Sequence, residues 1–344
     1  MRLVLLGTFV FLFAGCAVAE RSIGVTDFMV PAKEGEPEFS ARIWYSGIGG
    51  TEQRFGSSRI RPGYVAVPNA VIASQKQAPL IVLAHGSGGS AESMAWLATD
   101  LVRMGALVVA ADHPDSSDGD PSRASILKVW TQPQDIRRLL DQLLATEWRA
   151  RIDQDRISAI GFSLGGTTAM LLAGTRLQFE RVPVFCANHD DGSCRAFRHR
   201  YAKLDSNFFA RANANLMDGR VRAAVAIAPG FTESITAESQ QSLGTPILMI
   251  VGEKDQQLPP QTHVQPIRHL LSPHIRYKEI AGAQHFSFLP ICGDDAIDVL
   301  AETDEAFVCQ EVGSKSRAEI HAETLEAIEN FLLTTGILIG QSKW

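Results

Sequence analysis

From residue 80 onward, short and continuous apolar runs alternate with stretches in which apolar residues recur at helical spacing. Runs without polar alternation are typical of strands that are buried on both faces of a parallel sheet. Strands and amphipathic helices in alternation predict a doubly wound α/β architecture. The expected parallel strands are 80–84, 106–111, 157–160, 221–228, 247–251 and the short strand 276–280.

The expected helices lie between these runs. Apolar residues recur at helical spacing over 94–104, after Pro133, and over 317–333. Before residue 79 the pattern differs, because apolar and polar residues alternate as in strands with one solvated face. We therefore expect antiparallel strands at 23–30 and 39–45, with 64–67 as another.

One long segment does not follow the strand–helix alternation. Residues 174–219 contain two cysteines, many charges and the aromatic residues Phe197, Tyr201, Phe208 and Phe209. We interpret this segment as a cap or lid inserted between one helix and the next strand. A solvated loop is the alternative, although so long a stretch without structure is unusual in a compact domain.

The first 19 residues have the pattern of a signal peptide. Arg2 precedes an apolar run, and the small residues Ala17 and Ala19 form a cleavage site. The predicted organisation is a signal peptide at 1–19 and one domain at 20–344, exported to the periplasm or secreted. The sequence around Cys16 also resembles a lipoprotein box, with phenylalanine where leucine is usual, so anchoring through Cys16 is the alternative. No later segment is long and apolar enough to span a bilayer.

Composition narrows the possible partners. The mature chain of about 325 residues suits one large α/β domain or two smaller ones. A net charge of −6, with both signs interspersed, gives no basic stripe for nucleic acid. The sequence does not indicate an oligomeric state.

Four cysteines follow the leader, and an even number in an exported chain suggests disulfides. We expect the pairs Cys186–Cys194 and Cys292–Cys309, since each pair brackets a polar, loop-like insertion; buried free thiols are the alternative. No cysteine pair has the C-x-x-C spacing of a zinc site. The acidic pairs at 190–191 and 294–295 could bind calcium, but most such pairs lie in solvated loops. We therefore predict no metal site.

The most informative motif is G-x-S-x-G at 161–165, directly after the apolar run 157–160. It predicts a sharp turn from strand to helix that lifts the hydroxyl of Ser163 out of the sheet, with glycines where side chains would collide. A glycine-rich turn with a solvated serine is the alternative.

A serine nucleophile needs a base and a group that orients the base. On such a turn the chain order is serine, acid, histidine. Asp255 follows the strand 247–251 and is the expected acid, with Glu253 as the competitor. His285 follows the next strand and is the expected base. Other histidines are expected at the surface (His263, His269 and His274) or on the last helix in a solvated or structural position (His321).

The charge that develops on an attacked carbonyl oxygen needs preformed N–H donors. We expect one from Leu164, directly after the serine, and the other from Ser87 in the loop 85–89. The alternative for that loop is a tight turn without a catalytic role. His113 also follows a strand; closing the turn before Pro114 is the favoured interpretation, and contact with substrate is the other.

Together these residues resemble the α/β-hydrolases, and more narrowly the secreted bacterial dienelactone-hydrolase-like proteins, which are related to platelet-activating-factor acetylhydrolases. Two features depart from the pattern. Dienelactone hydrolases use a cysteine where this chain has Ser163, and animal-type acetylhydrolases place the acid after the strand that ends here at Ala228 without a carboxylate. The motifs that carry the resemblance are 43–45, 83–89, 112–114, 161–166, 252–255 and 282–288, with Cys292 and Cys309.

The resemblance implies an α/β-hydrolase fold, with a mostly parallel central sheet flanked by helices. It also implies a serine esterase that cleaves small carboxylic esters, often with short acyl groups, without a cofactor. A peptidase, an amidase or an acyltransferase with the same three residues is the alternative among enzymes. A non-catalytic binding protein on a hydrolase scaffold is the alternative outside them.

Overall fold

The computed structural model describes residues 20–114, 124–198 and 204–340. The expected leader and Cys16 therefore lie outside the described residues, as does Tyr201 of the expected cap. No helix in these three ranges is long and apolar enough to cross a membrane.

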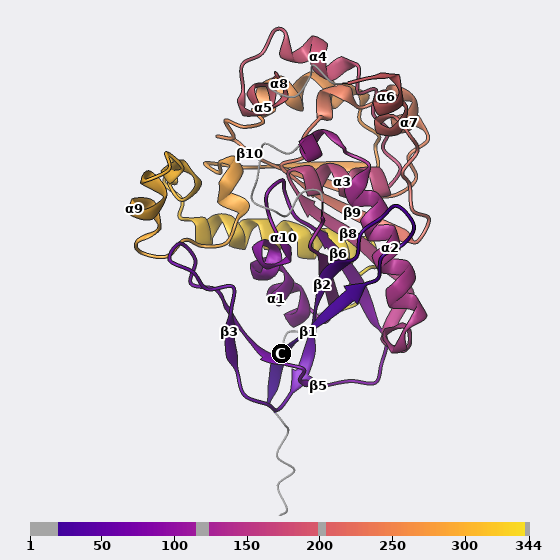
Figure 1. Ribbon diagram of the computed structural model, residues 1–344, viewed down its shortest axis with the longest axis vertical. Coiled ribbons are helices and arrows are strands. Elements are labelled where there is room, and N and C mark those ends of the chain that lie inside the picture. Colours follow the sequence, from indigo (N-terminus) through magenta and orange to yellow (C-terminus); the bar gives the residue numbers. More distant parts are fainter. Residues whose placement is uncertain (1–19, 115–123, 199–203, 341–344) are drawn as a thin grey trace, which may run out of the picture.

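The centre of the molecule is one sheet in which the expected buried runs are neighbouring parallel strands (Figure 1). Its order is β11-β10-β9-β8-β6-β7-β2-β1-β4-β3. The parallel strands are β6 (Ala78–Ala84), β7 (Leu107–Ala111), β8 (Ile152–Phe162), β9 (Val221–Ile227), β10 (Ile247–Gly252) and β11 (Ile275–Ile280).

The N-terminal strands extend this sheet beyond β7. They are β1 (Arg21–Val30), β2 (Phe39–Ile48), β3 (Gln53–Phe55), β4 (Tyr64–Pro68) and β5 (Val71–Ile72). Strand β2 pairs antiparallel with β1, as expected, and also pairs antiparallel with β7. The expectation for 64–67 was wrong in part, because β4 pairs parallel with β1 and antiparallel only with β3.

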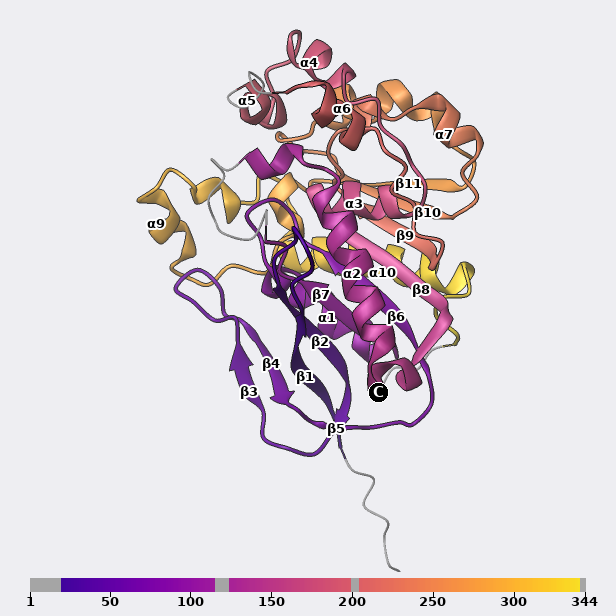
Figure 2. The ribbon, with the colours of Figure 1, turned by 45° about the vertical axis from the view of Figure 1, so that its right-hand side comes forward.

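Helices cover both faces of the sheet (Figure 2). On β6, Leu80 and Val82 point to the face that packs against α2 (Thr131–Ala145) and α3 (Leu164–Leu172). Ile81 and Leu83 point to the opposite face, under α1 (Ala95–Arg103) and α10 (Arg317–Thr334). Continuous apolar runs thus result from burial on both sides.

The expected cap segment lies above the carboxyl edge of the strands (Figure 2). Its helices are α4 (Arg181–Cys186), α5 (Gly192–Arg198) and α6 (Ser206–Ala212). The cysteine pairs Cys186–Cys194 and Cys292–Cys309 both lie at disulfide distance. The remaining short helices are α7 (Ala237–Gln241), α8 (Pro260–His263) and α9 (Ala296–Ala301).

The strand register brings the candidate site together. Ala84 of β6 pairs with Gly161 of β8, and Phe162 pairs with Ile227 of β9. Gly252 of β10 pairs with Ile280 of β11. Because parallel strands end at one edge, the loops that carry the predicted residues all begin there.

Candidate active site

Ser163 occupies a strained turn between β8 and α3. Its φ of 55° and ψ of −116° lie in a region that residues other than glycine rarely adopt. The Ser163 N–H donates to the Ile227 carbonyl oxygen at 2.8 Å, which holds the turn against β9. The side chain is partly exposed, so the hydroxyl is accessible above the sheet.

Two glycines make this turn possible. A Cβ at Gly161 would lie 2.0 Å from the carbonyl oxygen of Gly165, and a Cβ at Gly165 would lie 2.0 Å from the carbonyl oxygen of Ala84. Both contacts involve backbone, which cannot move aside as a side chain does. The spacing of the motif therefore follows from the close packing of β8, α3 and β6.

His285 faces this serine. Its Nε2 lies 3.1 Å from the Oγ of Ser163, across the carboxyl edge of the sheet. The residue begins a 3₁₀ helix, His285–Phe288, whose first turn is held by hydrogen bonds between Gln284 and Ser287. The ring is buried beside that of Phe162, with 5.0 Å between centroids, so its orientation is fixed by packing.

Asp255 binds the other side of that imidazole. Its Oδ2 lies 2.7 Å from the Nδ1 of His285, and its Oδ1 accepts the backbone N–H groups of Gln257 and Leu258, each at 2.8 Å. Burial alone would raise the pKa of the Asp255 carboxyl, but the charge and hydrogen bond of His285 and the two N–H donors outweigh it and lower the pKa.

These contacts fix the proton arrangement. An ionised Asp255 can only accept a hydrogen bond, so Nδ1 of His285 carries a proton and donates it. In the neutral imidazole the lone pair of Nε2 then points at the Ser163 hydroxyl, which is the geometry for removing a proton. Glu253 makes neither contact; it pairs with Lys254 and accepts the N–H of Gly282.

The loop after β6 lies beside the serine. A Cβ on Gly86 would lie 3.1 Å from the ring of Phe162 and 3.3 Å from the Cβ of Ser163, so a side chain here would require these neighbours to shift. The Gly86 carbonyl oxygen is held by the N–H of Gly89 at 3.0 Å and by Nδ1 of His85 at 2.7 Å. The Gly86 carbonyl and the Ser87 N–H belong to one planar trans peptide. The Ser87 N–H therefore points in the direction opposite to the carbonyl oxygen, away from the Gly89 and His85 donors.

Leu164 is the first residue of α3, where backbone N–H groups have no partner within the helix. The side chain of Ser87 is exposed, which leaves its backbone as the group that could act. The oxyanion-binding roles of Ser87 and Leu164 remain predictions.

His113 lies behind this loop, fully buried. Its N–H donates to Nε2 of His85 at 3.3 Å, and its Nδ1 lies 3.0 Å from Oδ2 of Asp135. Since Nε2 of His85 accepts, Nδ1 of His85 carries the proton and donates to Gly86. Burial and the neighbouring His113 lower the pKa of His85 to about 3, so the ring is neutral. The sequence pointed to the loop 85–89 but not to this network.

Two expectations about other residues were wrong. His263 is not at the surface but 1% exposed, with a carboxylate on each ring nitrogen. One of these belongs to Asp191, which is buried rather than solvated. His321 has a structural position, stacked on Trp96. In the described part of the chain, no group of histidine, cysteine and acidic residues could hold a metal ion.

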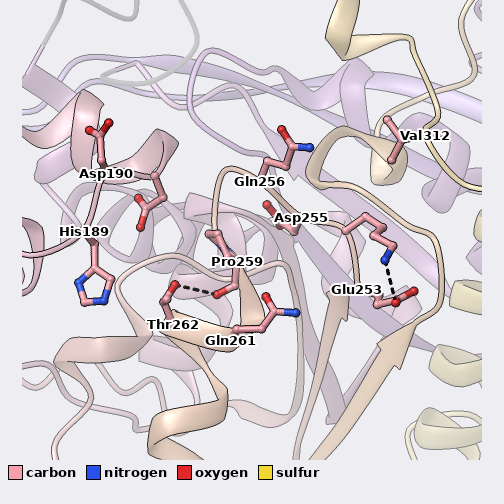
Figure 3. A pocket seen from close by; sticks show the side chains of 11 residues that line it. His189, Asp190, Glu253, Asp255, Gln256, Pro259, Gln261, Thr262 and Val312 are labelled. Carbon is pink, nitrogen blue, oxygen red and sulfur yellow. Dashed lines mark hydrogen bonds and ion pairs between the residues drawn. The ribbon is translucent and has the colours of Figure 1, made fainter.

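A pocket of about 530 Å³ lies between part of the cap and the loop that carries Asp255. Figure 3 shows His189 and Asp190 of the cap across this pocket from Glu253. The cap and the loop also touch directly, because the N–H of Ser193 donates to the carbonyl of Gln257 at 3.2 Å. The cap is thus joined to the segment that positions the acid.

Comparisons with known proteins agree with this architecture. The model of a family described as "Alpha/beta hydrolase family" matches residues 81–303. No curated protein matches the sequence. Among solved structures, a ferulic acid esterase from Streptomyces cinnamoneus is 20% identical with a TM-score of 0.60, covering 94% of this chain and 92% of its own.

Two further structures share the fold at similar coverage. A dienelactone hydrolase-like promiscuous phosphotriesterase from metagenomic libraries is 16% identical with a TM-score of 0.50, covering 89% of this chain and 98% of its own. A putative dienelactone hydrolase from Klebsiella pneumoniae is 14% identical with a TM-score of 0.50, covering 88% and 97%.

Proposed function

Because the chain belongs to the alpha/beta hydrolase family, we propose that it is a serine carboxylester hydrolase whose catalytic triad is Ser163, His285 and Asp255. The observation that carries the proposal is the continuous chain of hydrogen bonds from Ser163 Oγ through both ring nitrogens of His285 to Asp255. A solvated serine on an ordinary turn needs neither that chain nor a strained backbone.

The first half of the reaction is acylation. His285 Nε2 takes the hydroxyl proton while Ser163 Oγ attacks the ester carbonyl carbon, and the buried Asp255 carboxylate stabilises the imidazolium that forms. The N–H groups of Leu164 and Ser87 bind the carbonyl oxygen as it becomes negative. The tetrahedral intermediate then collapses, the alkoxide leaves with the proton from His285, and an acyl-serine remains.

The second half is hydrolysis of the acyl-serine. His285 removes a proton from water, the hydroxide attacks the acyl carbon, and Ser163 leaves with the proton returned by His285. A carboxylic acid and the free enzyme result, and no cofactor takes part.

The direct test is turnover of 4-nitrophenyl acetate by Ser163→Ala. We expect the triad contribution to be lost, a decrease of at least about 10⁴-fold in kcat. Ser87→Ala is the matched control, because it keeps the backbone N–H and should retain activity. Unchanged turnover in Ser163→Ala would show that Ser163 is not the nucleophile and would rule out the proposed mechanism.

Two further measurements separate the alternatives. Covalent labelling of Ser163 by a fluorophosphonate probe excludes a non-catalytic binding protein. Anilides and added alcohols, compared with the matching esters at one enzyme concentration, distinguish esterase from amidase or acyltransferase. Faster amide cleavage or acyl transfer than ester hydrolysis would favour those alternatives.

We also propose that the chain is exported after removal of residues 1–19 and acts on short-chain esters. The two cysteine pairs at disulfide distance are compatible with export, since disulfides persist in oxidising compartments. The intact mass of the mature protein tests this and distinguishes a free N-terminus at Glu20 from a lipidated Cys16. A series of nitrophenyl esters from acetate to decanoate tests acyl length.

A further inference from the structure

A second pocket lies away from the proposed catalytic residues. It has a volume of about 430 Å³ and is enclosed by α1, α10, the loop 56–64 and the chain at 290–291. None of Ser163, Asp255 and His285 lines it. Its volume falls in the range of small-molecule sites.

The walls of this pocket are flat and fixed. Trp96 stacks on His321 with ring centroids 3.7 Å apart and an angle of 12° between planes. The indole N–H of Trp96 donates to the Phe288 carbonyl oxygen at 3.1 Å, and Nε2 of His321 lies 2.9 Å from the Leu289 carbonyl oxygen. Such a surface is built in advance to pack against a planar apolar group.

Tyr64 lines the same pocket from the loop side. Its ring stacks on Phe55, with centroids 5.7 Å apart and an angle of 26°. The loop that precedes Tyr64 is held to the segment after Ile291 by the N–H of Gly293, which donates to the Ile60 carbonyl oxygen at 3.0 Å. Neighbouring rings and hydrogen bonds therefore hold both aromatic groups in place.

Arg61 supplies a charge at this pocket that the rest of the described chain does not balance. Its side chain is partly buried, and within the described ranges no carboxylate lies at ion-pair distance from it. Burial lowers the pKa of Arg61, and the positive Arg317 lowers it further. Arg317 has its own partner, Glu311, at 2.7 Å.

The two acidic residues that line the pocket each have a basic partner. Glu92 pairs through Oε1 with Arg42, while its buried Oε2 has no hydrogen-bond partner in the described ranges, and Asp100 pairs with Arg103 at 2.7 Å. His321 adds no charge, because burial lowers its pKa to about 4. Arg61 is thus the charged basic residue among those that line the pocket. It is partly buried and has no carboxylate partner in the described ranges, so an anionic ligand would supply the missing counter-ion.

We propose that this pocket binds a planar aromatic carboxylate, with the carboxylate on the Arg61 guanidinium and the ring against Trp96 and Tyr64. A guanidinium presents paired donors that match the two oxygens of a carboxylate. The fixed aromatic walls favour a flat ring over a flexible chain, since little rotational freedom is lost on binding. The site is independent of the proposed hydrolysis.

The test is isothermal titration calorimetry with 2-naphthoate and its neutral isostere naphthalene-2-carboxamide, using the full mature chain with Ser163→Ala. We expect naphthoate to bind about tenfold more tightly than the amide. Arg61→Gln should remove this preference, and Arg61→Lys should restore part of it. Equal affinity of the two compounds for the unsubstituted pocket would overturn the proposal.

A second variant locates the ligand. Ala322 is exposed on α10 and lines the pocket, so Ala322→Phe should fill it and prevent binding without affecting the fold. Thermal unfolding midpoints check that each variant is folded. Binding that survives Ala322→Phe, or that disappears when Ser163 of the wild type carries a fluorophosphonate, places the acid elsewhere and rejects the site.

Discussion

The Nε2 of His263 lies 3.0 Å from Oδ2 of Asp191, although the two residues are 72 positions apart in the chain. On the other side of the ring, Nδ1 lies 3.1 Å from Oε2 of Glu233. Asp191 belongs to the segment between Cys186 and Cys194, and His263 ends the helix that follows the loop of Asp255. A buried group of one imidazole and two carboxylates therefore anchors the cap to the sheet edge.

This arrangement predicts how stability depends on pH. Burial alone would lower the pKa of His263, but the hydrogen bonds and charges of Asp191 and Glu233 raise it to about 9. A group whose folded pKa exceeds its unfolded value of 6.5 contributes its full stabilisation below that value and loses it as the pH rises through 9. The difference between the folded and unfolded pKa values of His263 corresponds to roughly 3 kcal/mol in the free energy of unfolding.

We therefore expect His263→Gln to be destabilised by about this amount at pH 6 and by much less at pH 10. Urea unfolding of both proteins at pH 6, 8 and 10 gives the two free energies directly. A gap between wild type and variant that stays constant over this range would show that His263 is not charged in the folded state.

Asp255→Asn tests the orienting acid. The amide removes the negative charge and offers an N–H where Nδ1 of His285 needs an acceptor, so the ring adopts the wrong tautomer. We expect kcat for 4-nitrophenyl acetate to decrease by about 10⁴-fold, with little change in KM. The matched control is Glu253→Gln, two positions away on the same loop, which should retain activity; a larger loss there would assign the acid to Glu253.

His85 is predicted to be a positioning residue, acting through the Gly86 carbonyl on the Ser87 N–H. His85→Leu removes the donor to that carbonyl, and we expect kcat to decrease by up to about 100-fold, with KM nearly unchanged. His85→Asn places an amide N–H near the position of Nδ1 and should recover part of the loss. If both variants lose activity equally, His85 contributes packing rather than orientation of the peptide.

Much of this arrangement follows from local sequence. The turn at Ser163 depends on glycines two positions either side, so its signal is contained in five residues. Asp255 and His285 are found from chain order, because the carboxyl ends of parallel strands share one edge. These predictions depend on where strands end and turns begin, and the residues next to each turn are enough to indicate that.

Other features depend on partners distant in sequence. The parallel pairing of β4 with β1 is one of these, since alternation in 64–67 predicts a strand but not the direction of its neighbour. The burial of His263 is another, because its two carboxylates come from 30 and 72 residues away. From the sequence alone, a polar side chain on a short helix is expected to be exposed, because its distant buried partners cannot be identified.

The strained turn at Ser163 predicts a difference between two inactive variants. At a φ of 55°, alanine keeps the steric cost of its Cβ, whereas glycine adopts this conformation freely. We expect Ser163→Gly to unfold at higher urea concentration than Ser163→Ala, by about 1 kcal/mol in free energy, although glycine also gains freedom in the unfolded chain. The comparison uses two proteins without the hydroxyl, so changes in hydrogen bonding to His285 cancel. A glycine variant that is less stable than Ser163→Ala by about 0.4–1 kcal/mol, which is the entropy cost of glycine at an unstrained position, would mean that the backbone at Ser163 is not strained.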